Sequence, residues 1–182
     1  MVNIKGFHGT LDEKANKILN SKFIHSSKNS EWLGSGVYFF EKRKDAEWWA
    51  KLEAGKPQNQ GNLPTVLSAD IITEDEFFYD LDFRFNMNKM IEESRDLLEG
   101  LEGNLNMNEA EIRCVACNFF AKLYGIKVFA YTFPSIARNV IGFPYTRKQR
   151  QICVNDDDCI KNIQKVQELS LIHISEPTRR VV

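Results

Sequence analysis

The stretch Trp32-Leu33-Gly34-Ser35-Gly36-Val37-Tyr38-Phe39-Phe40-Glu41 decides how the rest of the chain is interpreted. Its apolar run, Val37–Phe40, is typical of a short buried strand. Gly34 and Gly36 allow positive φ angles and a close approach of the backbone to a ligand. Tyr38 places an aromatic ring and a hydroxyl at the mouth of this strand. A Gly-x-Gly before a strand predicts only a turn, so further motifs are needed to give the stretch a function.

Working outward, hydrophobic periodicity and turn residues predict short strands and helices on both sides of this stretch. Strands are expected at 4–7, 65–72, 126–132 and 151–155, and helices at 12–19, 44–51, 86–98, 109–123 and 159–167. Thr10 or Asp12 is the expected cap of the first helix, Gly100 and Gly103 close the third, and Gly125 ends the fourth. Segments 54–63 and 133–150 are expected to be loops. Strands interleaved with helices, without βαβ spacing, predict an α+β fold with a mostly antiparallel sheet.

The composition bounds the class of protein. The chain has 182 residues, 43% of them hydrophobic and 27% charged, and a net charge of −1. This predicts one globular domain, residues 1–168, without a global field that would draw it to nucleic acid or membrane. No apolar run approaches the roughly 18 residues of a membrane span, and the first motif leaves no room for a signal peptide, so a cytoplasmic protein is expected. Residues 169–182 resemble translated sequencing-adapter read-through and are interpreted as a non-native or disordered tail.

The four cysteines, Cys114, Cys117, Cys153 and Cys159, are expected to be buried free thiols. Cys114 and Cys117 have the spacing of a zinc-ligand pair, but they lie inside a helical pattern. Cys153 and Cys159 do not form a convincing second pair. No metal site is therefore predicted.

Two further motifs give the central stretch its functional interpretation. Upstream stands His8-Gly9-Thr10, and downstream the polar Gln151 opens an apolar strand. Together with Gly34-x-Gly36-x-Tyr38-Phe39, these motifs resemble the ADP-ribosyltransferases of the diphtheria-toxin and poly(ADP-ribose) polymerase type. The resemblance runs from His8 to about Ile160. It implies the split, mostly antiparallel sheet of that superfamily, with flanking helices, and NAD as the substrate.

The resemblance also implies roles for individual residues. His8 matches the histidine that bonds the adenosine ribose, Gly9 the glycine whose backbone holds the nicotinamide carboxamide, and Thr10 can add a hydroxyl. Tyr38 matches the tyrosine that stacks on nicotinamide, Gly36 belongs to the same NAD-binding motif, and Trp49 stands where the polymerases place a second aromatic ring. One position departs from the pattern. Ala46 replaces a small hydroxyl residue, so a carboxamide hydrogen bond is lost or made elsewhere, with Ser26 or Ser27 as candidates.

Gln151 matches the glutamate that completes a His-Tyr-Glu triad. Glutamine keeps the hydrogen-bond acceptor of glutamate but not its charge. It can therefore orient the ribose, but it stabilises a cationic sugar less than glutamate does and cannot act as a base. The resemblance thus implies transfer of a single ADP-ribose, with His8, Tyr38 and Gln151 as catalytic residues. Two of them have a simpler interpretation: a core histidine for His8, and for Gln151 an edge-strand glutamine that faces solvent. Trp49 can equally be a helix-face packing residue.

The basic residues Arg138, Arg147, Lys148 and Arg150 precede Gln151. In the family resembled, this region meets the acceptor, so these cations are candidates for binding NAD's pyrophosphate, an acidic protein face or nucleic-acid phosphate; a solvated loop is the alternative. The resemblance further suggests a toxin or defence effector with a neutralising antitoxin as partner. Two other functions stay open: a non-catalytic NAD or ADP-ribose binding module, and an RNA 2′-phosphotransferase on the same fold, for which no second supporting histidine is found.

Overall fold

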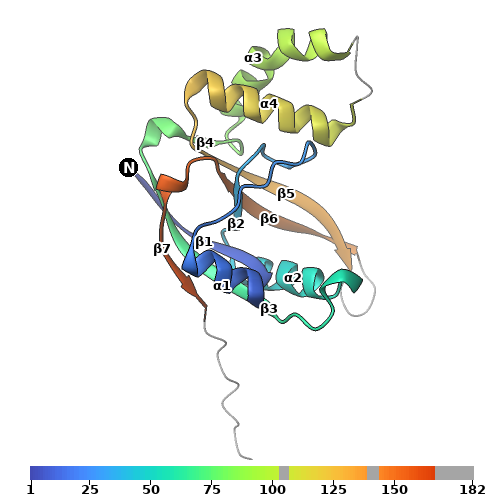
Figure 1. Cartoon of the computed structure of the whole chain (residues 1–182). Helices are drawn as coiled ribbons and strands as arrows, with labels where there is room; N and C mark the ends of the chain where they lie inside the picture. The colour runs from blue at the N-terminus through green and yellow to red at the C-terminus, as the bar shows by residue number, and fades with distance from the viewer. Residues whose placement is uncertain (103–106, 139–143, 167–182) are drawn as a thin grey trace, which may run out of the picture.

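The computed structural model describes residues 1–102, 107–138 and 144–166, in which one mixed, mostly antiparallel sheet is flanked by helices (Figure 1). The α+β prediction is confirmed. The sheet order is β4-β5-β6-β2-β1-β3-β7. Its strands are β1 (Val2–Leu11), β2 (Val37–Phe40), β3 (Pro64–Thr73), β4 (Phe78–Asp80), β5 (Val128–Arg138), β6 (Pro144–Val154) and β7 (Ile160–Lys165). Among these described strands, only the pairing of β4 with β5 is parallel.

In the part of the chain that the structure describes, four α-helices cover the two faces of the sheet: α1 (Asp12–Asn20), α2 (Arg43–Ala54), α3 (Arg84–Glu102) and α4 (Glu109–Tyr124). Leu67 packs in the cluster that contains Ala15 of α1, whereas its neighbour Val66 packs with Ala46 of α2. Because successive strand residues point to opposite faces, α1 and α2 lie on opposite sides of the sheet. α3 and α4 form a pair at one end of the molecule (Figure 1).

The predicted strand Val37–Phe40 is confirmed and lies at the centre of the sheet, between β1 and β6. Val37 and Phe39 are buried on the α1 face, while Tyr38 and Phe40 pack on the face that α2 to α4 share. This apolar run therefore has no solvent-facing side, which is why it lacks the polar alternation of a surface strand.

Local signals predicted the ends of α4 correctly. Asn108 accepts hydrogen bonds from the backbone N–H groups of Ala110 and Glu111, and the Glu111 carboxylate accepts one from the Asn108 N–H. At the other end Gly125 has a φ of 67°, a conformation that glycine adopts without strain. The cap expected for α1 was wrong, because Leu11 occupies that position and makes no side-chain cap bond. Gly100 lies inside α3, and Gly103 and the tail are outside the described residues.

The prediction of a long loop at 133–150 was wrong. β5 and β6 extend through this region as paired antiparallel strands, with Phe133 opposite Gln149 and Thr132 opposite Arg150. Prolines and clustered cations are common in loops, but cross-strand pairing overrides local preference in sheets. Residues 139–143, between the two strands, lie outside the described residues.

The prediction of a final helix at 159–167 was also wrong. Residues 160–165 form β7, which pairs with β3 and so covers an edge that would otherwise be open. Ile160 is buried in the core and Ile163 packs against it. Short apolar patterns of this length fit a helix or a strand, so only the free edge of β3 decides between them.

The four cysteines are buried and form no disulfide, as predicted. Burial raises the pKa of the Cys117 and Cys153 thiols, which keeps both protonated near neutral pH. Among the described helices, none combines the length and apolar character needed to cross a bilayer.

Candidate functional site

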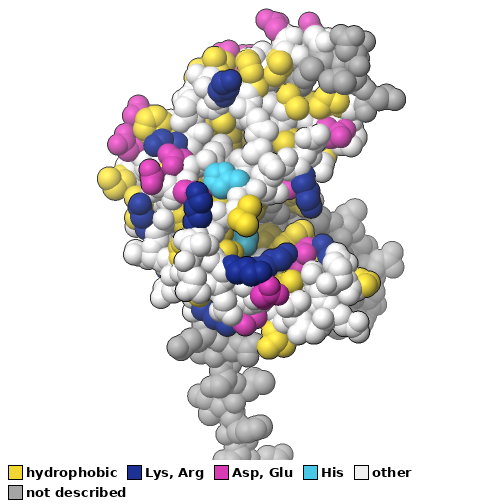
Figure 2. All heavy atoms as spheres, viewed as in Figure 1, with side chains coloured by type: hydrophobic (Ala, Val, Ile, Leu, Met, Phe, Trp, Pro, Cys, Tyr) yellow, Lys and Arg dark blue, Asp and Glu magenta, His cyan; other side chains and the backbone are white. Residues whose placement is uncertain are grey.

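A cavity of about 630 Å³ opens where β1 and β2 separate. The register between these strands pairs Phe7 with Phe40, and both strands line the cavity beyond this pair. Figure 2 shows a hollow on this side of the molecule, with apolar side chains inside it and basic side chains along its edge. Seven of the residues predicted from the motifs line this cavity: His8, Gly9, Thr10, Gly36, Tyr38, Trp49 and Gln151.

His8, Tyr38 and Gln151 lie on three neighbouring strands, β1, β2 and β6. Tyr38 pairs with Cys153, two residues after Gln151, so Tyr38 and Gln151 share a face of the sheet. His8 is next to Phe7, which pairs with Phe40, so its side chain leaves from the other face, where it contacts Phe39. Because β1 and β2 separate here, side chains from both faces of the sheet line one cavity.

The His8 ring is held by its neighbours in one orientation. Nδ1 lies 2.8 Å from the Tyr38 carbonyl oxygen, and the ring meets Phe23 edge-on at 5.2 Å between centroids. Burial lowers the pKa of His8, and the nearby Lys14 lowers it further against the opposing effect of the carbonyl. The neutral ring must therefore carry its proton on Nδ1 and donate it to the carbonyl. This leaves Nε2, which has no hydrogen-bond partner among the described residues, as an acceptor for a ligand hydroxyl.

The lowered pKa of His8 predicts that stability falls as the pH is lowered from 7.5 to 5. Unfolding releases His8 to its ordinary pKa near 6.5, so below that value the unfolded chain binds more protons than the folded one. The limiting slope is about 1.4 kcal/mol per pH unit. Chemical unfolding at several pH values should show this slope in the wild type and a smaller one in His8→Asn. A slope that persists in His8→Asn and disappears in His25→Asn would contradict the assignment.

The Tyr38 hydroxyl has a structural role that the motif did not indicate. It accepts a hydrogen bond from the Leu33 N–H at 2.8 Å and donates one to the Gly34 carbonyl at 2.6 Å. Burial raises the pKa of Tyr38, so the hydroxyl stays protonated. The tyrosine thereby ties the glycine-containing segment to β2. Its ring packs beside Leu33 and Cys153 while Tyr38 also lines the cavity.

Tyr38→Phe is expected to lower the free energy of unfolding by about 1–3 kcal/mol, because the Leu33 N–H and the Gly34 carbonyl lose a buried partner. Thermal or urea unfolding measures the change. Tyr131→Phe is the matched control, since no described residue hydrogen-bonds the Tyr131 hydroxyl and this side chain packs in the same cluster. Equal stability of the two variants would show that the hydroxyl of Tyr38 does not hold the segment.

Gln151 is 9% exposed, and its side-chain amide has no hydrogen-bond partner among the described residues. An amide in this position can both donate to and accept from a ligand. It does not face bulk solvent from an edge strand, because β6 lies between β5 and β2. Gln151 thus lies in the same cavity as His8 and Tyr38, while its catalytic role stays a prediction.

Two of the cavity residues lie at the contact with α2: Gly9 packs against this helix, and Trp49 belongs to it. A Cβ on Gly9 would lie 2.1 Å from the Ala46 carbonyl oxygen, so only glycine allows this close approach of helix and strand. Ala46 is fully buried and does not line the cavity. Trp49 lines the cavity and is 37% exposed, so it is not simply a core residue.

Of the two serines considered as substitutes for a hydroxyl at position 46, Ser26 lines the cavity and donates to Glu31, and Ser27 does not line it.

Three of the basic residues before Gln151 have described side chains and lie outside the cavity lining: Arg147, Lys148 and Arg150. Arg147 pairs with the buried Asp45 at 2.5 Å and covers the Trp48 ring, whereas Lys148 is exposed. The Arg138 side chain is outside the described part. This placement gives no support to binding of NAD's pyrophosphate by Arg147, Lys148 or Arg150; their contact with an acceptor remains a prediction.

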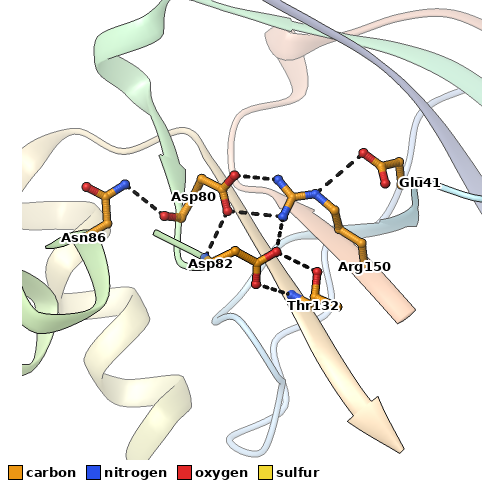
Figure 3. A network of polar contacts seen from close by, with 6 residues as sticks. All are labelled: Glu41, Asp80, Asp82, Asn86, Thr132 and Arg150. Atoms are coloured by element: carbon orange, nitrogen blue, oxygen red, sulfur yellow. Dashed lines mark hydrogen bonds and ion pairs between the residues drawn. The ribbon is translucent and has the colours of Figure 1, made fainter. Parts of the chain in front are cut away.

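Arg150 is the centre of an ion-pair network (Figure 3). Its guanidinium donates to Asp80 at 2.7 and 3.2 Å and to Asp82 at 2.5 Å, and Glu41 lies 3.6 Å from Nε. Burial disfavours the charge on Arg150, but these carboxylates outweigh burial and raise its pKa. Asp82 also accepts hydrogen bonds from the Thr132 N–H and hydroxyl. The network thus joins the short edge strand β4 to β5, β6 and the end of β2.

The sequence interpretation missed the charges that do line the cavity. Four lysines lie there, and two carboxylates with them: Lys14, Lys17, Lys22, Lys28, Glu31 and Glu53. Lys17 pairs with Glu13 and Lys22 lies 3.8 Å from Asp157, whereas Lys14 and Lys28 form no ion pair with a described residue. The i, i+3 spacing of Lys14 and Lys17 places both on one face of α1, which was a usable signal. The polar segment that carries Lys28 and Glu31 had no such pattern.

Comparisons with known proteins add one partial similarity. A stretch of 79 residues, 41% of the chain, is 34% identical to an uncharacterized protein of Methanocaldococcus jannaschii. This stretch covers 36% of that protein, so the chain spans about a third of the relative's length. No family model matches the sequence, and no solved structure matches it. The cavity geometry therefore carries the functional argument.

Proposed function

We propose that the protein binds NAD in the cavity between β1 and β2 and transfers one ADP-ribose to a macromolecular acceptor, with release of nicotinamide. The observation that carries this proposal is the meeting of three distant motifs, around His8, Tyr38 and Gln151, in one cavity. Its volume of about 630 Å³ falls within the range of small-molecule and cofactor sites.

The residues in the cavity suit the parts of NAD. Tyr38 and Trp49 offer aromatic surface for the nicotinamide ring, and stacking of this kind is worth about 1–3 kcal/mol per base in nucleotide binding. The His8 Nε2 acceptor suits a ribose hydroxyl. Lys14 and Lys28, which no described carboxylate neutralises, suit the pyrophosphate.

Breaking the nicotinamide–ribose bond passes through an oxocarbenium-like transition state, as glycoside cleavage does. The Gln151 amide oxygen can accept a hydrogen bond from the ribose and stabilise the cationic sugar through its dipole. It cannot take a proton from an acceptor hydroxyl at neutral pH, so transfer of a single unit is proposed rather than polymer synthesis.

The proposal is tested by incubating the protein with cell extract and NAD labelled in the adenosine moiety. Label that enters protein or nucleic acid, together with an intact-mass increase of one ADP-ribose, is the expected result. The labelled fraction identifies the class of acceptor. Saturable NAD binding in a thermal-shift titration without any transfer or hydrolysis would instead identify a non-catalytic NAD-binding module, which the uncharged Gln151 would favour. Absence of binding and transfer would refute both.

A further inference from the structure

The cavity between β1 and β2 contains a carboxylate that no described cation neutralises. Of the described residues, two acidic ones line this cavity, Glu31 and Glu53. Glu53 forms an ion pair with Lys56, whereas Glu31 forms none with a described residue. One oxygen of Glu31 accepts a hydrogen bond from the Ser26 hydroxyl, and the other has no described partner. Because charges withdrawn from water are usually paired, this partly buried carboxylate in a cavity wall indicates a positively charged ligand group.

The segment that carries Glu31 is held in place by its own hydrogen bonds. Ser26 and Gly36 exchange backbone hydrogen bonds at 2.9 and 3.0 Å, which close the segment into a loop. Within this loop the Glu31 N–H donates to the Lys28 carbonyl at 3.3 Å, and the Tyr38 hydroxyl ties the residues that follow Glu31 to β2. The backbone at Glu31 is therefore ordered before a ligand binds, so little conformational entropy remains to be lost there.

Glu31 lies near the aromatic ring that is proposed to stack on nicotinamide. Both Glu31 and Tyr38 line the cavity. Burial is the main cause of the raised pKa of Tyr38, and Cys153 and the negative charge of Glu31 raise it further, as expected for a carboxylate close to this side chain. A nicotinamide ring stacked on Tyr38 therefore lies within the electrostatic field of Glu31.

The nicotinamide ring of NAD carries a positive charge that is absent in NADH. The lysines that line the cavity repel this charge, whereas a nearby carboxylate attracts it. The pyrophosphate is the same in both dinucleotides, so the lysines act on it equally in the two. The charge on the ring is thus the part of the ligand that Glu31 can distinguish.

We propose that Glu31 selects the oxidised dinucleotide by pairing with the positive charge of its nicotinamide ring. This role of Glu31 rests on the proposed binding of NAD in the same cavity. When the bond between ribose and nicotinamide breaks, its electron pair passes to the ring nitrogen and the ring becomes neutral. The attraction by Glu31 then ends, so it strengthens substrate binding without retaining the product. Because Glu31 acts on the bound substrate, it affects affinity rather than turnover.

The test measures the dissociation constants of NAD and NADH by isothermal titration calorimetry. Wild type should bind NAD roughly tenfold more tightly than NADH, the size of a close charge pair in a partly solvated site. Glu31→Gln should remove most of this preference, mainly by weakening NAD, and Glu31→Asp should retain part of it. Glu53→Gln is the matched control and should change the preference much less, because Lys56 already pairs with Glu53. In nicotinamide release, Glu31→Gln should raise KM and leave kcat unchanged.

The salt dependence of the wild type gives a measurement that needs no variant to fold. Raising NaCl from about 0.05 M to about 0.5 M should lower the preference for NAD, because salt screens the attraction between the ring and the carboxylate. A preference that persists in Glu31→Gln, or that falls equally in Glu53→Gln, would overturn the role of Glu31 and leave NAD binding intact. Absence of NAD binding by the wild type would instead refute the proposed function, and the role of Glu31 with it.

Discussion

Arg150→Met is expected to lower the free energy of unfolding by about 3 kcal/mol. The substitution leaves Asp80, Asp82 and Glu41 close together without the guanidinium that neutralises them. Breaking a buried ion pair by removing one partner typically costs 3–5 kcal/mol, and the lower end applies here because Glu41 and Asp82 are partly exposed. The edge strand β4 should be the first element to lose hydrogen-exchange protection, since the network joins it to β6.

The pH dependence of this loss distinguishes charge from packing. Arg150 and the Thr132 hydrogen bonds outweigh burial and lower the pKa of Asp82, so this contribution is present above the ordinary Asp pKa of about 3.9 and disappears as the pH falls through the folded value. The difference between wild type and Arg150→Met should therefore persist from pH 7 to about pH 4 and shrink as the pH falls below the ordinary Asp pKa. Asp82→Asn in the Arg150→Met background should restore part of the stability. A difference that is independent of pH would indicate lost packing of the arginine stem.

Lys5→Met is the matched control. The Lys5–Asp70 pair also joins two side chains of the sheet, at 3.0 Å, but its lysine is exposed. Exposed pairs contribute about 0–1 kcal/mol. A loss in Lys5→Met as large as that in Arg150→Met would show that burial of the network is not the cause.

Gln151→Ala is expected to reduce kcat for NAD cleavage by roughly 10- to 100-fold while changing NAD affinity much less. A hydrogen bond to a charged group is worth about 1.5–3 kcal/mol, and the sugar becomes cationic only in the transition state. Steady-state nicotinamide release and a separate NAD titration measure the two quantities. Gln151→Glu should keep the affinity similar and either preserve activity or raise NAD hydrolysis. The control is Gln164→Ala, the same change at an exposed position of β7 in the same sheet.

If Gln151→Ala changes neither affinity nor turnover, Gln151 is a buried strand residue without a catalytic role. The structure then indicates which carboxylates are candidates for the catalytic role instead. Glu41 pairs with Arg150, and Glu111 caps α4, so neither lines the cavity. Glu31 and Glu53 do line it, and they would become the first carboxylates to substitute.

Much of the candidate site was predictable because its signals are local. The apolar run Val37–Phe40 is short, preceded by small residues and followed by charged ones, which favours a strand. The glycine at position 9 and the motifs around Tyr38 and Gln151 predicted a common cavity, and the structure brings them together. The end of α4 was equally clear, because a glycine such as Gly125 acts within one turn of its own position.

Other features depend on partners distant in the sequence. Arg150 had the surroundings of a loop residue, but Asp80 and Asp82, about 70 positions away, make it a structural residue of the sheet. Ile160 lies in a strand because β3 offered an unpaired edge. No local pattern could indicate that the Tyr38 hydroxyl bonds the backbone of its own preceding segment, since that depends on how the segment folds back.

The residue types and their spacing therefore specified the α+β class, the central strand and the identity of the residues that meet in the cavity, because propensity, capping and apolar patterning act over a few residues. Tertiary structure alone decided that β5 and β6 extend as strands, that β7 replaces a helix, and that lysines of α1 and of the segment before β2 supply the cavity's positive charge. These outcomes depend on strand edges and buried carboxylates that come together only when distant segments pack. The free energy of these contacts is larger than that of the weak local preferences for a loop or a helix in the same segments.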